Sequence, residues 1–373
     1  MKYRRMPIEM ESPEQLGYDK IRCNLAESSL TDVNWRDIGF NVSELPLAYT
    51  DHYGKPELRE LIARGYDGIR PDEILLVPGA AAALFIIATS LLEKKDHLLV
   101  QFPNYATNLE TPFAIGCEIG KIESHFDEGY AIGLDVFEKM CRPNTKLISI
   151  TNPHNPSGRM CGQNIYDKLT GIAAKNGIYL LVDETYRELV FNGKQLPLAA
   201  SFSDHVISVS SVSKAYGLPG LRIGWIVTKD KKLMETFLAA KEQIFITNSI
   251  LDEEAVYYYL HNRQEMILDS HAEARRKFSM VKKWMEANEF FEWNVPEGGV
   301  VGFLRFKKNL KPDVALFYKE LNDKHGTFVG PGHWFGVEDR YFRLGFGYPS
   351  EEELQEGLTA INAAAHAAIQ KRS

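Results

Sequence analysis

Short apolar runs alternate with segments of helical periodicity from about residue 46 to 265. Such alternation is typical of βαβ units, which build a mostly parallel sheet. Each run is continuously apolar, as expected of strands that are buried on both faces. The predicted strands are Ile74–Val77, Leu98–Val100, Leu147–Ile150, Ile178–Val182, Val206–Val209 and Ile223–Val227. The pattern therefore predicts an α/β core with a mostly parallel sheet.

The pattern changes after about residue 265, where a long charged helix is predicted near His271–Asn288, followed by short strands and a terminal helix from Ser350. This order is typical of a smaller α+β domain. No long linker rich in Pro, Gly or Ser separates the two parts, so we expect a firm interface between them. The apolar stretch Ala80–Leu92 is too short to span a bilayer and predicts a buried helix.

Polar and small residues directly follow five of the predicted strands. In open α/β sheets, ligands bind outside the carboxyl ends of the strands, so chemistry should gather there. The five segments are Pro78–Ala81, Pro103–Tyr105, Asn152–Gly158, Asp183–Tyr186 and Ser210–Lys214. We expect these segments to line one site.

Composition narrows the function classes. The 373 residues, 45% hydrophobic and 25% charged, suit an ordinary globular protein of about two domains. A net charge of −7 provides no basic field for nucleic acid or anionic lipid, which favours small-molecule chemistry. The basic start meets Glu9, Glu11 and Pro13 before any apolar region of a signal peptide, so a cytoplasmic protein is expected.

Metal and redox chemistry have little support in the sequence. The cysteines Cys23, Cys117, Cys141 and Cys161 show no close pairing, and we expect reduced thiols. The ten histidines lack the spacing of a zinc site, so no metal is predicted. No GxGxxG follows the first strand, which argues against a nicotinamide dehydrogenase.

Lys214 stands among small and apolar residues at a strand end, within the segment Ser211–Gly224. Desolvation disfavours an ammonium ion, so a lysine there could have a lowered pKa and attack an aldehyde as a neutral amine. The alternative is a lysine whose charged end simply extends to solvent from a loop. The segment alone does not decide between the two.

Other strand ends supply what a pyridoxal phosphate site needs, a carboxylate for the pyridine nitrogen and donors for the phosphate. Asp183 closes an apolar strand, where an unpaired carboxylate would be costly, although it could instead cap a helix. Arg222 can present a planar fork of donors to a phosphate. The Gly79–Ala81 turn opens a predicted helix, whose amino end attracts anions. Together they predict a phosphate pocket.

Five motifs, in this order, resemble those of the fold-type I, class I/II aminotransferases, which depend on pyridoxal phosphate. They are Tyr49–Arg59, Asn152–Gly158, Val182–Tyr186, Ser211–Lys214 and Arg343–Phe346. The resemblance extends from about Tyr49 to Leu344. It implies a three-layer large domain over residues 46–265 and a smaller α+β domain from residues 1–45 and 266–373.

The resemblance also implies roles around the cofactor ring. Lys214 would hold pyridoxal phosphate as a Schiff base and carry the proton between the substrate Cα and cofactor C4′. Asp183 would pair with the pyridine nitrogen. Asn155 and Tyr186 would hydrogen-bond the phenolic oxygen, and Tyr105 would stack on the ring.

Further residues would hold the phosphate and the substrate. The phosphate would be bound by the amides of Ala80 and Ala81, by Ser211 and by Arg222, with Tyr49 reaching the cofactor of a neighbouring subunit. A homodimer follows from that last role. Arg343 would grip the substrate α-carboxylate by a bidentate pair, next to Asn155.

Two positions bear on substrate choice. Glu27 lies in Asn24–Ser28, where many members of this family have a glycine-containing segment that closes over the substrate. Gln243 stands where dicarboxylate-specific members place an arginine from the partner subunit, which disfavours aspartate as the preferred donor.

The expected function is transamination between an L-amino acid and a 2-oxo acid. A C–S lyase acting by β-elimination, or a cyclising enzyme acting by γ-elimination, remains the alternative, because the same fold and residues support these reactions. A cofactor-binding transcriptional regulator is disfavoured, because the chain is acidic and the predicted cofactor domain begins near Tyr49.

Overall fold

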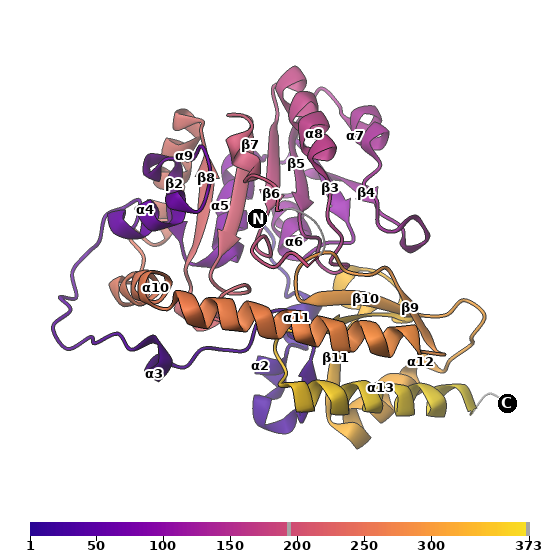
Figure 1. Ribbon diagram of the computed structural model, residues 1–373. Helices are drawn as coiled ribbons and strands as arrows, with labels where there is room; N and C mark the ends of the chain where they lie inside the picture. The colour runs from indigo at the N-terminus through magenta and orange to yellow at the C-terminus, as the bar shows by residue number, and fades with distance from the viewer. Residues whose placement is uncertain (192–194, 371–373) are drawn as a thin grey trace.

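The computed structural model describes residues 1–191 and 195–370 (Figure 1). Its larger sheet has seven strands in the order β2-β8-β7-β6-β5-β3-β4. They are β2 (Ile74–Val77), β3 (His97–Phe102), β4 (Glu118–Glu123), β5 (Thr145–Thr151), β6 (Tyr179–Asp183), β7 (Val206–Ser211) and β8 (Gly224–Thr228). All neighbours pair in parallel except β8, which is antiparallel to both β2 and β7. The sheet is therefore mostly parallel, as predicted.

The six predicted strands are confirmed within one or two residues at most ends. The strand β4 was not predicted from the sequence. It pairs only with β3, and along it only Gly120 and Ile122 are buried. An edge strand with one solvent-facing side carries polar residues, so it lacks the continuous apolar run that marked the others.

Helices cover both faces of this sheet because successive strand residues point to opposite sides. On one face, Leu75 and Val77 pack with α5 (Gly79–Leu91) and α9 (Lys231–Ile244). On the other face, Ile74 and Leu76 pack with α4 (Pro56–Arg64) and α10 (Ile250–Asn262), and further along, α7 (Leu134–Met140) and α8 (Gln163–Asn176) cover β5 and β6. The three-layer α/β architecture is confirmed.

The second sheet has five strands and joins the two ends of the chain. Its order is β1 (Cys23–Leu25), β11 (Thr327–Pro331), β12 (Tyr341–Gly345), β10 (Val301–Phe306) and β9 (Phe291–Trp293). Strand β1 pairs in parallel with β11, and the other neighbours are antiparallel. An aromatic core beneath it packs against α11 (Gln264–Glu286), α12 (Val314–Lys319) and α13 (Glu351–Gln370). Residues from both ends of the chain thus build the smaller sheet and its helices.

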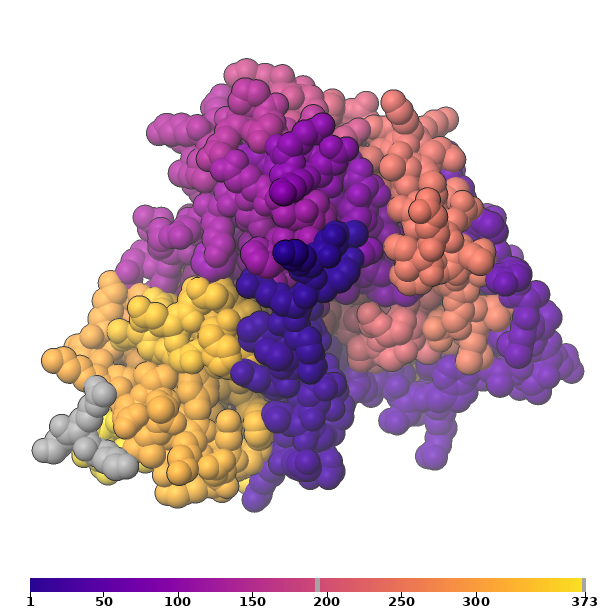
Figure 2. All heavy atoms as spheres, turned by 180° about the vertical axis from the view of Figure 1, so that it is seen from behind, coloured from indigo at the N-terminus to yellow at the C-terminus, as the bar shows by residue number. Residues whose placement is uncertain are grey.

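The amino-terminal segment packs against both parts through α1 (Pro7–Met10) and α2 (Pro13–Leu16). Ile8 of α1 is buried in one cluster with Ala106, Trp334 and Phe335. Figure 2 shows these indigo residues lying over the junction between the magenta and the yellow parts of the chain. None of the helices in residues 1–191 and 195–370 is long and apolar enough to cross a membrane.

Short elements complete the fold. They are α3 (Trp35–Ile38), α6 (Thr107–Ile115), the 3-10 turns η1 (Tyr18–Lys20), η2 (Pro71–Glu73), η3 (Phe126–Glu128), η4 (Ala199–Ser201), η5 (Pro219–Leu221) and η7 (Gly332–Phe335), and the π-turn η6 (Glu320–Lys324). Residues in or next to the turns η5 and η7 line a cavity of the protein.

Candidate active site

A cavity of about 460 Å³ lies at the carboxyl ends of β5, β6 and β7, and the smaller sheet contributes to its wall. Every predicted site residue except Tyr49 lines it: Ala80, Ala81, Tyr105, Asn155, Asp183, Tyr186, Ser211, Lys214, Arg222 and Arg343. These residues come from segments far apart in the chain, and the parallel strands collect their polar ends at one edge. Tyr49 is 80% exposed and does not line this cavity.

The amino end of α5 and Arg222 form an anion-binding corner. Gly79 begins the helix with φ +84°, and a Cβ there would overlap the Arg222 guanidinium. A Cβ on Gly224 would lie 2.7 Å from the carbonyl carbon of Gly79. Both glycines thus allow a close approach of Arg222 and β8 to the amide groups of Ala80 and Ala81. A phosphate fits this corner, because a helix amino end and a guanidinium both favour a dianion.

The Asp183 carboxyl group is 5% exposed and accepts a hydrogen bond from the amide of Thr185 at 3.1 Å. Burial raises its pKa, and the hydrogen bonds from Thr185 and the positive charge of Lys214 oppose that rise. A cationic N–H donor placed against this carboxylate would offset the desolvation of its charge. The pyridinium of pyridoxal phosphate is such a donor, so Asp183 fits the role that the motif suggested.

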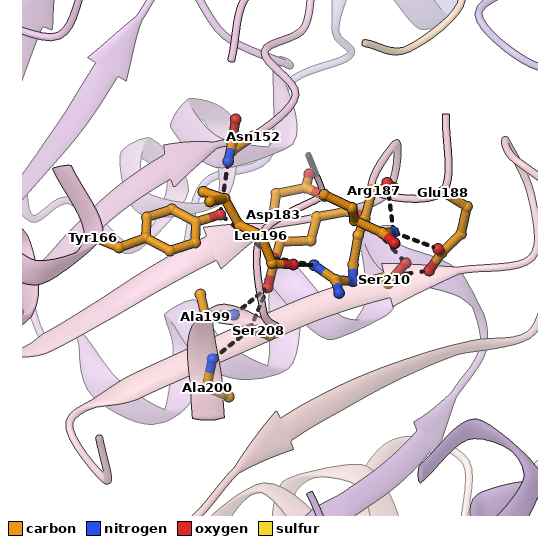
Figure 3. Close-up of polar contacts among 12 residues, drawn as sticks. Asn152, Tyr166, Asp183, Arg187, Glu188, Leu196, Ala199, Ala200, Ser208 and Ser210 are labelled. Atoms are coloured by element: carbon orange, nitrogen blue, oxygen red, sulfur yellow. Dashed lines mark hydrogen bonds and ion pairs between the residues drawn. The ribbon is translucent and has the colours of Figure 1, made fainter. Parts of the chain in front are cut away.

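A second carboxyl group, Glu184, follows Asp183 in the chain and is held by polar neighbours, of which Arg187, Ala199 and Ser208 are labelled in Figure 3. It accepts hydrogen bonds from Ser208 Oγ at 2.6 Å and from the amide of Ala199 at 3.0 Å, and it pairs with Arg187 at 3.7 Å. Burial raises the pKa of Glu184 to about 7, against the lowering effect of Arg187 and Ser208. Because Glu184 is tied to these neighbours, the adjacent Asp183 is held in place on the cavity side.

Arg343 comes from β12 and is 3% exposed. Its Nη2 donates to the carbonyl of Ala26 at 2.8 Å and its Nη1 to Asn155 Oδ1 at 3.1 Å, while its buried Nε has no hydrogen-bond partner in the described parts of the chain. Burial lowers the pKa of this guanidinium, and the negative charge of Glu27 is among the effects that oppose the change. A buried guanidinium with an unused donor suits a carboxylate ligand.

Two aromatic residues complete the walls. The Tyr186 hydroxyl donates to the carbonyl of Ser28 at 3.0 Å, which links the end of β6 to the amino-terminal segment. The Tyr105 hydroxyl donates to Glu9 Oε1 at 3.4 Å, and burial raises the pKa of Tyr105 to about 12. The position of Tyr105 on the wall allows a ring to stack on it.

Lys214 follows β7 and Ser211 and is partly buried on the cavity wall. Its backbone carbonyl accepts a hydrogen bond from the amide of Leu30 at 3.0 Å, which fixes the main chain. Within residues 1–191 and 195–370, its Nζ makes no hydrogen bond or ion pair that would hold it away from a ligand. The cavity therefore contains an available amine, a buried carboxylate and an anion corner, which together fit pyridoxal phosphate.

Several wall residues were not predicted from the sequence. They are Ile8, Glu9, Ser12, Pro13, Glu14 and Tyr18 of the amino-terminal segment, Ser28, Ser29 and Asp32 after β1, and Trp334 of η7. No local pattern marks them, because the fold brings the wall together from distant parts of the chain. Of this region, the sequence singles out Glu27, which stands where many members of the family have a glycine-containing segment.

The model of the aminotransferase class I and II family matches residues 43–361. The chain belongs to this family. It is thus a pyridoxal phosphate-dependent aminotransferase with the fold-type I architecture.

Individual relatives of this aminotransferase include both transaminases and other enzymes. Capreomycidine synthase of Streptomyces vinaceus is 30% identical over 290 residues, which cover 78% of this chain and 73% of the relative. A PLP-dependent aminotransferase structure from Streptococcus suis 89-1591 superposes with a TM-score of 0.90 at 24% identity, covering 99% of both chains. The PLP-dependent cyclase OrfR superposes with a TM-score of 0.87 at 26% identity, covering 100% of this chain and 99% of that one.

Proposed function

We propose that Lys214 is the residue through which this aminotransferase holds its cofactor and moves an amino group between an L-amino acid and a 2-oxo acid. The observation that carries the proposal is the presence of Lys214, Asp183, Arg222 and Arg343 on one cavity of about 460 Å³. When bound, pyridoxal phosphate supplies an electron sink that stabilises negative charge at the substrate Cα.

The side chains around the cofactor have separate roles in this proposal. The Lys214 amine takes the proton from Cα and returns it, as a general base and acid. Asp183 keeps the pyridine nitrogen protonated, because its buried carboxylate favours a cation beside it. Asn155 donates to the phenolic oxygen. Tyr186 does so when its hydroxyl proton turns away from the carbonyl of Ser28, and Tyr105 packs on the ring face. Ser211, Arg222 and the α5 amides of Ala80 and Ala81 bind the phosphate.

Arg343 orients the substrate. Its guanidinium grips the α-carboxylate with two parallel hydrogen bonds, and Asn155, which already bonds Nη1, keeps the fork in one orientation. A fixed carboxylate fixes the rotation about Cα, which decides the bond that is broken.

The active unit in this proposal is a cytoplasmic homodimer. Tyr49 and Leu47 are 80% and 87% exposed on one subunit, which leaves both available to a second copy. Tyr49 then reaches the phosphate of the partner's cofactor.

Replacement of the amine tests the proposal directly. In Lys214→Ala, the visible absorbance band of lysine-bound cofactor should disappear, and turnover should fall by a factor of at least about 10³. Lys282→Ala, at an exposed position on α11, should keep the absorbance band and normal turnover. Full turnover of Lys214→Ala, measured with amino acid and 2-oxo acid together, would contradict the proposal.

Elimination or cyclisation is the second candidate, and the likeness to capreomycidine synthase and to the cyclase OrfR motivates it. Both outcomes start from the same loss of the Cα proton and require no oxo acid acceptor. Multiple turnovers of an amino acid without any 2-oxo acid, followed by mass spectrometry of the product, would favour this candidate over transamination.

A further inference from the structure

Besides Asp183, four carboxylates line the same cavity, and these four come from the first 32 residues of the chain. They are Glu9, Glu14, Glu27 and Asp32. Glu9 and Glu27 are partly buried, and Glu14 and Asp32 are exposed at the rim. Like charges gathered on one concave wall repel one another, so such a wall favours a cation.

No positively charged group of residues 1–191 and 195–370 forms an ion pair with these four carboxylates. Glu9 and Glu27 receive only the long hydrogen bonds from Tyr105 and Tyr18, each at 3.4 Å. Burial and the negative charge of Glu27 raise the pKa of Asp32, and Tyr348 and Lys214 oppose that rise. The contrast is Glu11 of the same segment, which pairs with His333 at 2.7 Å and accepts from Trp334 at 2.7 Å.

The cations on the cavity have other partners. In the proposed function, Lys214 takes the cofactor, Arg222 its phosphate and Arg343 the substrate α-carboxylate. Arg343 is nine-tenths buried, lines the cavity and keeps its Nε unused within the described chain, which independently points to an anionic ligand group there. A cationic group of the ligand would then be the partner inside the cavity for the partly buried Glu9 and Glu27.

Arg343 and Glu27 lie near each other on the cavity wall, so one ligand could contact both, with its α-carboxylate on Arg343 and its distal group near Glu27. Arg343 Nη2 donates to the carbonyl of Ala26, and Glu27 is the next residue. Neighbouring Cα atoms are about 3.8 Å apart, so an amino acid whose carboxylate lies on Arg343 extends its side chain along the wall that carries Glu27.

We propose that the amino donor is an amino acid with a cationic distal group, an ammonium or a guanidinium, which Glu27 receives with Glu9, Glu14 and Asp32 around it. This inference rests on the proposed function and specifies its substrate class. A neutral side chain would leave these carboxylates uncompensated, and a second carboxylate would be repelled by them.

L-arginine and L-citrulline test the inference, because they have the same length and differ in charge at the distal group. The holoenzyme is mixed with each amino acid, and the loss of the visible cofactor band is followed by stopped flow over a concentration series. The apparent Kd for L-arginine or L-ornithine should be at least roughly tenfold lower than that for L-citrulline. A hydrogen bond between charged groups contributes about that factor to affinity. Added salt should reduce the difference, because Glu27 is partly exposed to solvent.

Variants locate the recognition. Glu27→Gln should raise the apparent Kd for L-arginine roughly tenfold and leave that for L-citrulline unchanged. Asp32→Asn, at an exposed position, should act in the same direction with a smaller effect. Glu286→Gln is the matched control, an exposed carboxylate outside the cavity, and should leave both amino acids unaffected.

The outcomes separate the two levels of the proposal. If neutral amino acids bleach the band as well as cationic ones, or if Glu27→Gln weakens both test ligands equally, the substrate class is wrong and the aminotransferase mechanism stands. If no amino acid changes the band at any concentration, the proposed function fails, and the substrate class fails with it.

Discussion

Arg343 is a buried positive charge on the wall of the cavity. An ionised group taken from water costs several kcal/mol unless it is well paired. Its hydrogen bonds to Asn155 and Ala26 and its position 5.1 Å from the centre of the Phe335 ring meet part of that cost. In the proposed function the bound substrate carboxylate offsets the rest, so Arg343 should contribute strongly to substrate affinity.

The change Arg343→Lys tests that contribution. A lysine keeps the charge and loses the planar fork, so KM for the amino donor should rise about ten- to a hundredfold, with a smaller effect on kcat. Steady-state kinetics over a range of donor concentrations measure the two separately. Arg340→Lys is the control, because Arg340 donates to the backbone of Phe306 and lies outside the cavity. An unchanged KM in Arg343→Lys would remove Arg343 from substrate binding.

At the scale of elements, the segment α1–α2 is held over the cavity by a histidine. His333 of η7 bridges Glu11 at 2.7 Å and Asp339 at 2.8 Å. Burial alone would lower the pKa of His333, but the hydrogen bonds to Glu11 and Asp339 outweigh it and raise the pKa. Protonation of His333 and docking of the α1–α2 segment are therefore linked. The stabilisation of the docked segment by protonated His333 is complete below the ordinary histidine pKa, and it is lost as the pH rises through the raised pKa of His333.

Amide hydrogen exchange over residues 7–16 measures this linkage. Protection, corrected for intrinsic exchange, should be greater near pH 6 than near pH 9, which lie on either side of the titration of His333 (about 6.5 when unperturbed). His333→Gln should remove the difference, whereas His366→Gln, at an exposed position on α13, should preserve it. Equal protection at both pH values in the unaltered protein would show that His333 does not control docking.

At the scale of the whole molecule, two sheets meet at one cavity, and both chain ends build the smaller of them. The one predicted site residue outside this arrangement is Tyr49, whose exposure leaves it without a role in its own subunit. In the proposed homodimer a second copy gives it one, because Tyr49 then reaches the cofactor phosphate of the partner.

Mixed dimers test that requirement. Neither Lys214→Ala nor Tyr49→Ala alone should retain normal activity: the first lacks the amine, and the second should bind the cofactor phosphate more weakly. When the two variants are unfolded together and refolded, up to one site in each mixed dimer combines an intact Lys214 with an intact Tyr49. Activity at low cofactor concentration should therefore exceed that of either variant refolded alone. No gain, with mixed dimers verified by differential tagging, would place Tyr49 outside the partner's site.

Sequence alone determined the continuously apolar strands of the large sheet, β4 excepted, and their polar ends, because hydrophobic periodicity and turn residues act locally. The segment around Lys214 and the carboxylate of Asp183 could be predicted as site residues for the same reason, because both directly follow predicted strands. Tertiary structure alone decided the antiparallel direction of β8, the edge strand β4, and the pairing of β1 with β11. It also decided that Glu9 and Glu27 share a wall with Arg343, over three hundred positions away in sequence. Such proximity arises from the packing of whole elements, which no local pattern encodes.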